Sequence, residues 1–132
     1  MKAILAALAL TGAALGLDAA LLRSDAAREV LVPDPVRVVQ SVVGALAARR
    51  VETAHAHADE SSVSEDDLAA WAAALRAEHG DFRFEDAVER RAGDAAEVRT
   101  RLHTERTKTV ERTFRLTRDP STDLWKVVAL SG

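Results

Sequence analysis

Asp86, Thr100 and Arg112 are the side chains of this sequence whose types and spacing suggest chemistry. The alternation of the strands around them predicts that all three lie in one row on the buried face of a sheet. Strands two apart are separated by about 9.6 Å, a gap that an Asp and an Arg side chain nearly bridge. A carboxyl group in an apolar cavity has a raised pKa and can serve as an acid or a base. The candidate ligand-binding residues are therefore Asp86, Thr100, Arg112 and Trp125, with Asp86 as the acid or base if the site is catalytic.

The same residues also have a purely structural interpretation. A β-bulge near Asp86 would turn its side chain outward, and Arg112 would then extend its charged end to water at the edge of the sheet. A buried charge without a partner is costly, so the row requires either ion pairing or access to water. Both interpretations stay open at this point.

Other arrangements that carry chemistry are missing from the sequence. His55 and His57 are two residues apart on an expected helix, so their side chains point to different sides. His55 lies one turn before Asp59, a spacing that is common without any metal. Cysteine is absent, and there is no Gly-rich phosphate loop, nucleophile elbow or zinc spacing. We therefore expect no metal and no cofactor.

The elements that must position these side chains are four strands in the last third of the chain. Apolar and polar residues alternate there with the period of a half-buried strand. Turn residues separate the segments, as at Gly93-Asp94 and at Asp119-Pro120. The expected strands are Asp81–Ala92, Ala95–Glu105, Lys108–Arg118 and Leu124–Leu130.

The register of these strands follows from bringing the apolar residues to one face, because a slip of one residue would invert a strand. All three hairpins can satisfy this condition together. The expected pairs are Phe84 with Leu102, Val88 with Val98, Leu102 with Val110, Val98 with Phe114, Leu116 with Trp125, and Phe114 with Val127.

Three helices are expected before the strands. Asp34 can cap the first, Val36–Arg49, with Pro35 at its first position. A short helix, Glu52–Ala58, comes next. The third begins after Ser64 and ends at Gly80. The sequence thus predicts an α+β, cone-like fold in which an N-terminal apolar helix precedes about three helices packed on a curved four-stranded antiparallel meander.

This order of elements, with Phe114–Leu116, a turn and then Leu124–Val128 at its end, resembles a known family. It is similar to small bacterial domains of the nuclear transport factor 2-like, cystatin-like cone superfamily, in particular to exported ones of uncharacterised function. The resemblance covers Pro33 to Gly132. It implies helices wrapped around a curved sheet to form a cone, often with a pocket, and often a dimer formed through the outer sheet face. Enzymes of the superfamily combine an Asp base with Tyr or His; this sequence has no tyrosine, and Asp86 matches no motif of the family.

The N-terminal segment suggests a location. Lys2 precedes a charge-free run from Ala3 to Leu17, the pattern of a signal peptide or a membrane-anchor helix over residues 1–22. Residues 23–32 would be a tether, and 33–132 the folded domain. The domain would then be exported across the cytoplasmic membrane or anchored in it. The alternative is a cytoplasmic domain whose N-terminal helix packs on the core.

Composition limits the function further. The formal net charge is −3, and Arg and Glu interleave on the outer sheet face, which argues against nucleic acid as a partner. The favoured hypothesis is a non-catalytic exported or membrane-tethered module that binds a protein partner or forms a homodimer through the sheet. The alternative is a cone that binds a small apolar ligand and carries out lyase- or isomerase-like chemistry at Asp86. A filled cone favours the first, and an open one the second.

Overall fold

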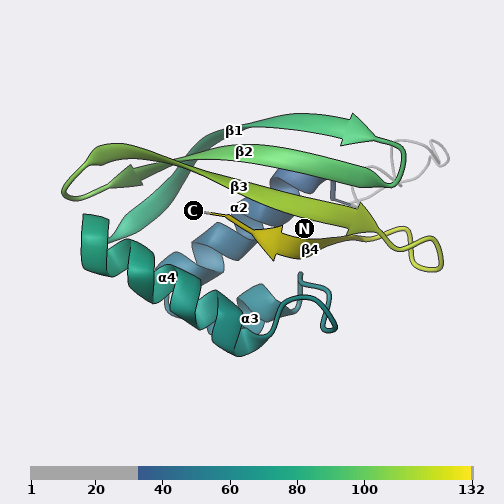
Figure 1. The fold of residues 1–132 in the computed structure, drawn as a ribbon, viewed down its shortest axis with the longest axis horizontal. Coiled ribbons are helices and arrows are strands. Elements are labelled where there is room, and N and C mark those ends of the chain that lie inside the picture. The colour runs from purple at the N-terminus through teal and green to yellow at the C-terminus, as the bar shows by residue number, and fades with distance from the viewer. Residues whose placement is uncertain (1–32, 132) are drawn as a thin grey trace, which may run out of the picture. The chain divides into compact units, whose positions relative to one another are not determined.

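The computed structural model describes residues 33–131. The expected signal or anchor helix (1–22) and the tether (23–32) lie outside the described residues. The helices are α2 (Pro35–Ala47), α3 (Val51–His55) and α4 (Glu65–His79), and the strands are β1 (Phe82–Ala92), β2 (Ala95–Thr104), β3 (Lys108–Arg118) and β4 (Trp125–Leu130). The strands form one antiparallel sheet in the order β1-β2-β3-β4, with the helices on one of its faces (Figure 1). The predicted three-helix, four-strand α+β fold is confirmed.

The two longer helices begin at side-chain caps. Asp34 accepts a hydrogen bond of 2.9 Å from the Arg37 N–H, and Ser64 and Asp67 form a reciprocal capping box. α2 ends at Ala47, two residues earlier than expected, because Arg49 takes a left-handed conformation with φ 62°. None of the helices between Pro35 and His79 is long and apolar enough to cross a bilayer.

The short helix also ends early, at His55 rather than Ala58, because the next residues pair with the sheet. The His57 carbonyl oxygen accepts from the Val127 N–H at 3.0 Å, and the Asp59 N–H donates to the Val127 carbonyl at 2.9 Å. Ala58 thereby forms a parallel bridge to Val127. The loop before α4 thus covers the outer edge of β4 at this point.

The register between β2 and β3 is the one expected, with Leu102 opposite Val110 and Val98 opposite Phe114. Phe84 also lies opposite Leu102, but a bulge between Phe84 and Asp86 then shifts β1 by one residue. Glu89, and not Val88, therefore faces Val98. The expected pairing of Val88 with Val98 is wrong.

The register of β4 also differs from the prediction. Leu116 lies opposite Val127 and Phe114 opposite Leu130, whereas pairing with Trp125 and Val127 was expected. The physical reason is a longer turn: the Asp119 N–H donates to the Leu124 carbonyl, so β4 begins only at Trp125. A second bulge, between Arg115 and Leu116, accounts for the rest of the shift.

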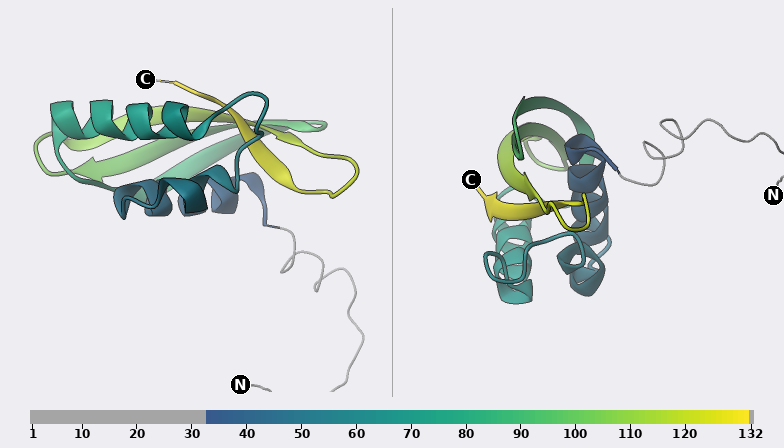
Figure 2. Two further views of the ribbon diagram at one scale, coloured as in Figure 1. Left: turned by 90° about the horizontal axis from the view of Figure 1, so that it is seen from below. Right: turned by 90° about the vertical axis from the view of Figure 1, so that its right-hand side faces the viewer.

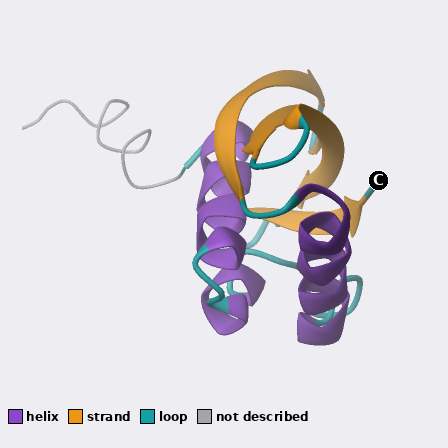
Figure 3. Ribbon diagram, turned by 90° about the vertical axis from the view of Figure 1, so that its left-hand side faces the viewer, coloured by secondary structure: helices purple, strands orange, loops and turns teal. Residues whose placement is uncertain are grey.

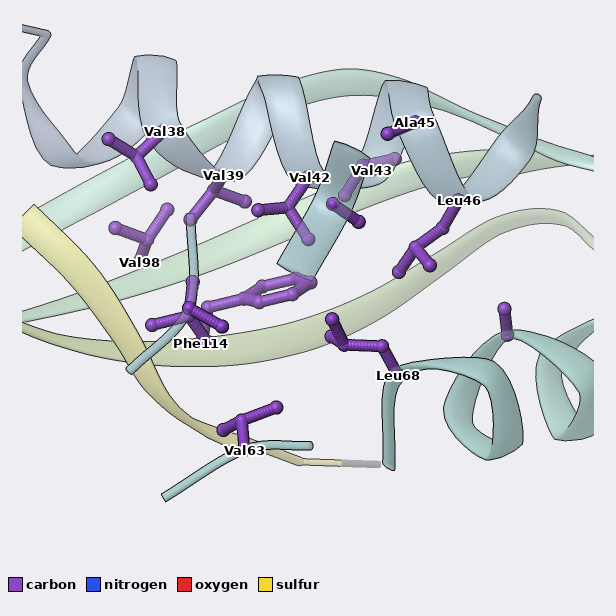
Figure 4. Close-up of a cluster of buried hydrophobic side chains, with 14 of the residues drawn as sticks. Val38, Val39, Val42, Val43, Ala45, Leu46, Val63, Leu68, Val98 and Phe114 are labelled. Atoms are coloured by element: carbon purple, nitrogen blue, oxygen red, sulfur yellow. The ribbon is translucent and has the colours of Figure 1, made fainter. Parts of the chain in front are cut away.

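The core lies between the inner face of the sheet and the helices. α2 and α4 run across this face, and the sheet curls over them (Figures 2 and 3). Val39 and Val42 of α2 point toward Val98 and Phe114 of the sheet, and all four are fully buried (Figure 4). Trp71 of α4 adds an edge-to-face contact with Phe114, the ring centroids 5.4 Å apart. Side chains thus fill the interior of the cone.

Candidate functional site

Asp86 lies on the outer face of the sheet. The bulge turns its side chain away from the helices, and Arg101 of β2 pairs with it through two hydrogen bonds, one of them from Nε to Oδ1 at 3.0 Å. The Arg101 guanidinium holds the pKa of Asp86 below its ordinary value, chiefly through hydrogen bonding. The expected row is therefore wrong at Asp86, and the carboxyl group has neither the burial nor the raised pKa of a base in a cavity. The bulge interpretation is confirmed.

Thr100 and Arg112 do lie opposite each other on β2 and β3. Thr100 is fully buried, and its Oγ1 donates to the Val98 carbonyl at 3.4 Å. Arg112 is half-buried, and its Nη1 donates at 2.9 Å to the Glu111 carbonyl on the open edge of β3. Thr100 is thus part of the packed interior, while the charged end of Arg112 reaches a groove at the rim.

Trp125 lies at the other end of the sheet from this groove. It is buried, and the Arg91 guanidinium lies over its ring, 5.1 Å from the centroid. Glu89 orients Arg91 through a contact of 2.6 Å between Oε2 and Nε. Asp86, Thr100, Arg112 and Trp125 therefore do not meet at one site.

A groove with a volume of about 560 Å³ lies between α4 and the last residues of β4. Trp71 and Leu130 form much of its apolar wall, and Arg112 lines it from β3. The Trp71 Nε1–H donates to the Ser131 carbonyl at 3.3 Å, which fixes the indole at the rim. This volume is within the range of pockets that hold small ligands. The remaining lining residues are Ser62, Val63, Asp67, Ala70, Ala74, Leu75, Glu78, Val128 and Ala129.

Trp71 was not among the candidate residues named from the sequence, so its role in the groove was missed. A signal was present: Ala70 and Ala74 flank Trp71 on the helix, and such small side chains leave space beside a large ring. The two carboxyl groups of the groove have other partners. Asp67 Oδ2 accepts the Ser64 N–H of the capping box, and Glu78 Oε1 lies 3.6 Å from His79 Nε2.

Two of the histidines make side-chain contacts within the fold. His55 Nε2 donates to the Val63 carbonyl at 3.0 Å, and His79 Nδ1 contacts the Thr107 hydroxyl. Burial and, to a smaller extent, the nearby Lys126 ammonium lower the pKa of His57. Between residues 33 and 131, no three His, Asp or Glu side chains gather in a way that could hold a metal ion.

The outer face of the sheet is the other surface with functional character. In the part of the chain described, no helix lies over it (Figure 1). It carries alternating charges, with ion pairs between Asp86 and Arg101 and between Arg90 and Glu97, the latter 3.7 Å apart. Val88 lies among these charges, and 67% of its surface is exposed. It is the large apolar side chain that is exposed among the residues described.

No family model and no curated protein matches the sequence. Among the solved structures similar to it is a Nostoc punctiforme protein of unknown function with a cystatin-like fold, at 11% identity and TM-score 0.54, covering 84% of this chain and 92% of that one. Another is a Sinorhizobium meliloti protein named as a candidate polyketide cyclase, at 14% identity and TM-score 0.52, covering 77% of this chain and 95% of that one. Likeness at such low identity shows the fold alone. The chain has the cystatin-like cone fold, as its resemblance to the nuclear transport factor 2-like superfamily implied.

Proposed function

We propose that this chain is a non-catalytic interaction module that binds a protein partner, or a second copy of itself, through the outer face of its sheet. Its N-terminal segment would export it or tether it at the membrane. The observation that carries the proposal is the filled cone. Val98, Leu102 and Phe114 of the inner face are fully buried under the helices.

The placement of the acidic side chains supports the same function. The candidate base, Asp86, is exposed and paired with Arg101. On the inner face, Glu89 is half-buried and paired with Arg91. An acid–base catalyst needs a carboxyl group that faces a substrate. Both of these carboxyl groups are instead paired with an arginine, so the cyclase name of the Sinorhizobium neighbour gives no mechanism for this chain.

The experiment that tests the proposal is site-specific photo-crosslinking of the full chain in its source cells. A photoreactive residue replaces Val88 on the outer face or, as a control, Ala73, which is exposed on α4. We expect position 88 to give one defined adduct, either with this chain or with a single other protein, that Arg101→Glu abolishes. Position 73 should give none. Equal adducts from both positions, or none from position 88, would overturn the proposal.

A second candidate function rests on the groove. Within residues 33–131, Arg112 forms no ion pair, and its guanidinium donates instead to the neighbouring Glu111 carbonyl. A cation beside an apolar wall suits a small apolar ligand that carries an acid group. Decanoate is a suitable probe. A saturable shift of the Trp71 indole NMR signal that Arg112→Gln removes would support this function, and an unchanged signal at millimolar decanoate would exclude it for this class of ligand.

A further inference from the structure

The strand register arranges the charges of the outer face in rows, each with one residue from β1, β2 and β3. One row has the signs plus, minus, plus. The row two residues further along has a single charge, and the next has minus, plus, minus. In strand order the rows are Arg90, Glu97 and Arg115; Val88, Arg99 and Thr113; and Asp86, Arg101 and Glu111.

We propose that a second copy of this chain docks on this face, with a twofold axis along the middle row. This inference rests on the proposed function, which makes the outer face the interaction surface. Such an axis lies between the two facing sheets and runs across their strands. It places each residue opposite a residue of the second copy that lies on the same strand, equally far from the middle row but on its other side. Arg90 then faces Asp86 of the second copy, Glu97 faces Arg101, and Arg115 faces Glu111. Every charge of the two outer rows meets an opposite charge.

The alternative axis, along β2, gives the contrary result. It would place Arg90 opposite Arg115 of the second copy, and Asp86 opposite Glu111. Like charges held against each other disfavour an interface strongly. Both axes keep the strands of the two facing sheets aligned. The charge pattern favours the axis along the middle row and disfavours the axis along β2.

The rows beyond the central three fit the same axis. One holds Arg83, His103 and Thr109, and the other holds Ala92, Ala95 and Thr117. The axis along the middle row brings these two rows together, so Arg83 meets Ala92, His103 meets Ala95 and Thr109 meets Thr117. On the axis itself, Val88 meets Val88 of the second copy, which would cover this exposed apolar side chain.

Arg99 is the unfavourable position in this arrangement, because it lies on the axis and faces its own copy. The contact area is also limited. Five rows on three strands span about 10 by 27 Å between backbone positions, an area of about 270 Å². This area is smaller than the roughly 800 Å² that each partner buries in a stable complex. The dimer should therefore be weak and should dissociate as salt is added.

Sedimentation velocity of the full chain in mild detergent tests the arrangement. Arg101→Glu places a carboxylate opposite Glu97 of the second copy, and this repulsive pair occurs twice in each dimer. We expect the substitution to weaken self-association by about tenfold or more. Combining it with Glu97→Arg creates an all-positive row facing an all-negative one, at unchanged net charge. This double variant should dimerise at least as tightly as the unaltered chain, and Arg99→Thr should dimerise more tightly.

Circular dichroism of each variant establishes that it is folded. A double variant as weak as Arg101→Glu alone, or an Arg101→Glu chain that associates normally, would overturn the arrangement. The crosslink at position 88 distinguishes failure of the dimer from failure of the proposed function. An adduct with a different protein and no self-association would refute the twofold dimer and leave the proposed function standing, whereas the loss of both would refute both.

Discussion

Asp86 and Arg101 face each other across β1 and β2 and form a two-pronged ion pair on the outer face of the sheet. The pair exists because a bulge after Phe84 turns Asp86 away from the helices. One extra backbone residue thus removes the candidate acid from the cone and adds a charge to the outer face. The same bulge turns Val88 outward, and it turns Ala87 and Glu89 toward the inner face.

Thr100→Val is expected to leave the domain as stable as before, or slightly more stable. Its hydroxyl group makes one long hydrogen bond, of 3.4 Å, to the Val98 carbonyl in a fully buried position. Replacing a weakly bonded buried hydroxyl by a methyl group changes the free energy of unfolding by about 1 kcal/mol or less. Urea denaturation measures this. A loss of several kcal/mol would mean that Thr100 belongs to a polar network.

Phe114→Ala should destabilise the domain by about 3–5 kcal/mol. The ring is fully buried and packs against Trp71, so its removal leaves a cavity in the centre of the core. Val88→Ala is the matched control, because Val88 is 67% exposed and truncating it should change stability by only about 0.5 kcal/mol. Equal effects of the two substitutions in denaturant titrations would contradict a filled cone.

Gly80→Ala and Gly44→Ala should act in opposite directions. Gly80 has φ +85°, and a Cβ there would lie 2.7 Å from Glu105 Oε1, which accepts the Asp81 N–H. We expect a loss of roughly 1–3 kcal/mol. Gly44 lies in α2, where an added Cβ would meet no atom within 4 Å beyond its chain neighbours and the backbone of its own helix, so alanine should stabilise by roughly 0.5–1 kcal/mol. Thermal melts of both variants check the two signs, and a shift of Tm in the same direction would contradict them.

Stability should fall as the pH drops below about 6.5. Burial and Lys126 lower the pKa of His57 from 6.5 in the folded chain. Between the lowered value and 6.5 the unfolded chain binds more protons than the folded one, so acidification favours unfolding. His57→Gln should flatten this slope of the unfolding free energy below about pH 6.5, while the Val127 bridge survives because it uses the backbone. An unchanged slope would show that other groups cause the pH dependence.

The alternation of residues was sufficient to predict the strands, their order and the register of β2 against β3. It could not reveal the bulge in β1, because Phe82, Phe84 and Val88 share a parity that an unbroken strand would also show. After the bulge the inward positions are Ala87 and Glu89, which carry no hydrophobic signal. The β4 register failed for a similar reason, since the length of the turn at Asp119 depends on hydrogen bonds formed only after folding.

The candidate site was predicted less well than the fold. One interpretation of the sequence correctly placed the charged end of Arg112 at the edge of the sheet. The groove beside it could not be predicted, because it depends on how α4 approaches β4. Trp71 and Leu130 lie 59 positions apart in the sequence and meet only through that packing. Site prediction from one sequence therefore failed where two elements create a surface together.

The most direct test of the central claim, a filled cone with a binding surface on its outside, is native mass spectrometry of the full chain purified gently in detergent from its source cells. It reports assembly state and any retained small molecule in one spectrum. We predict a dimer, or a complex with one other protein, in which this chain carries no added small mass. A monomer that retains a small molecule, and loses it in Trp71→Ala or Arg112→Gln, would contradict the account and make the groove the functional site.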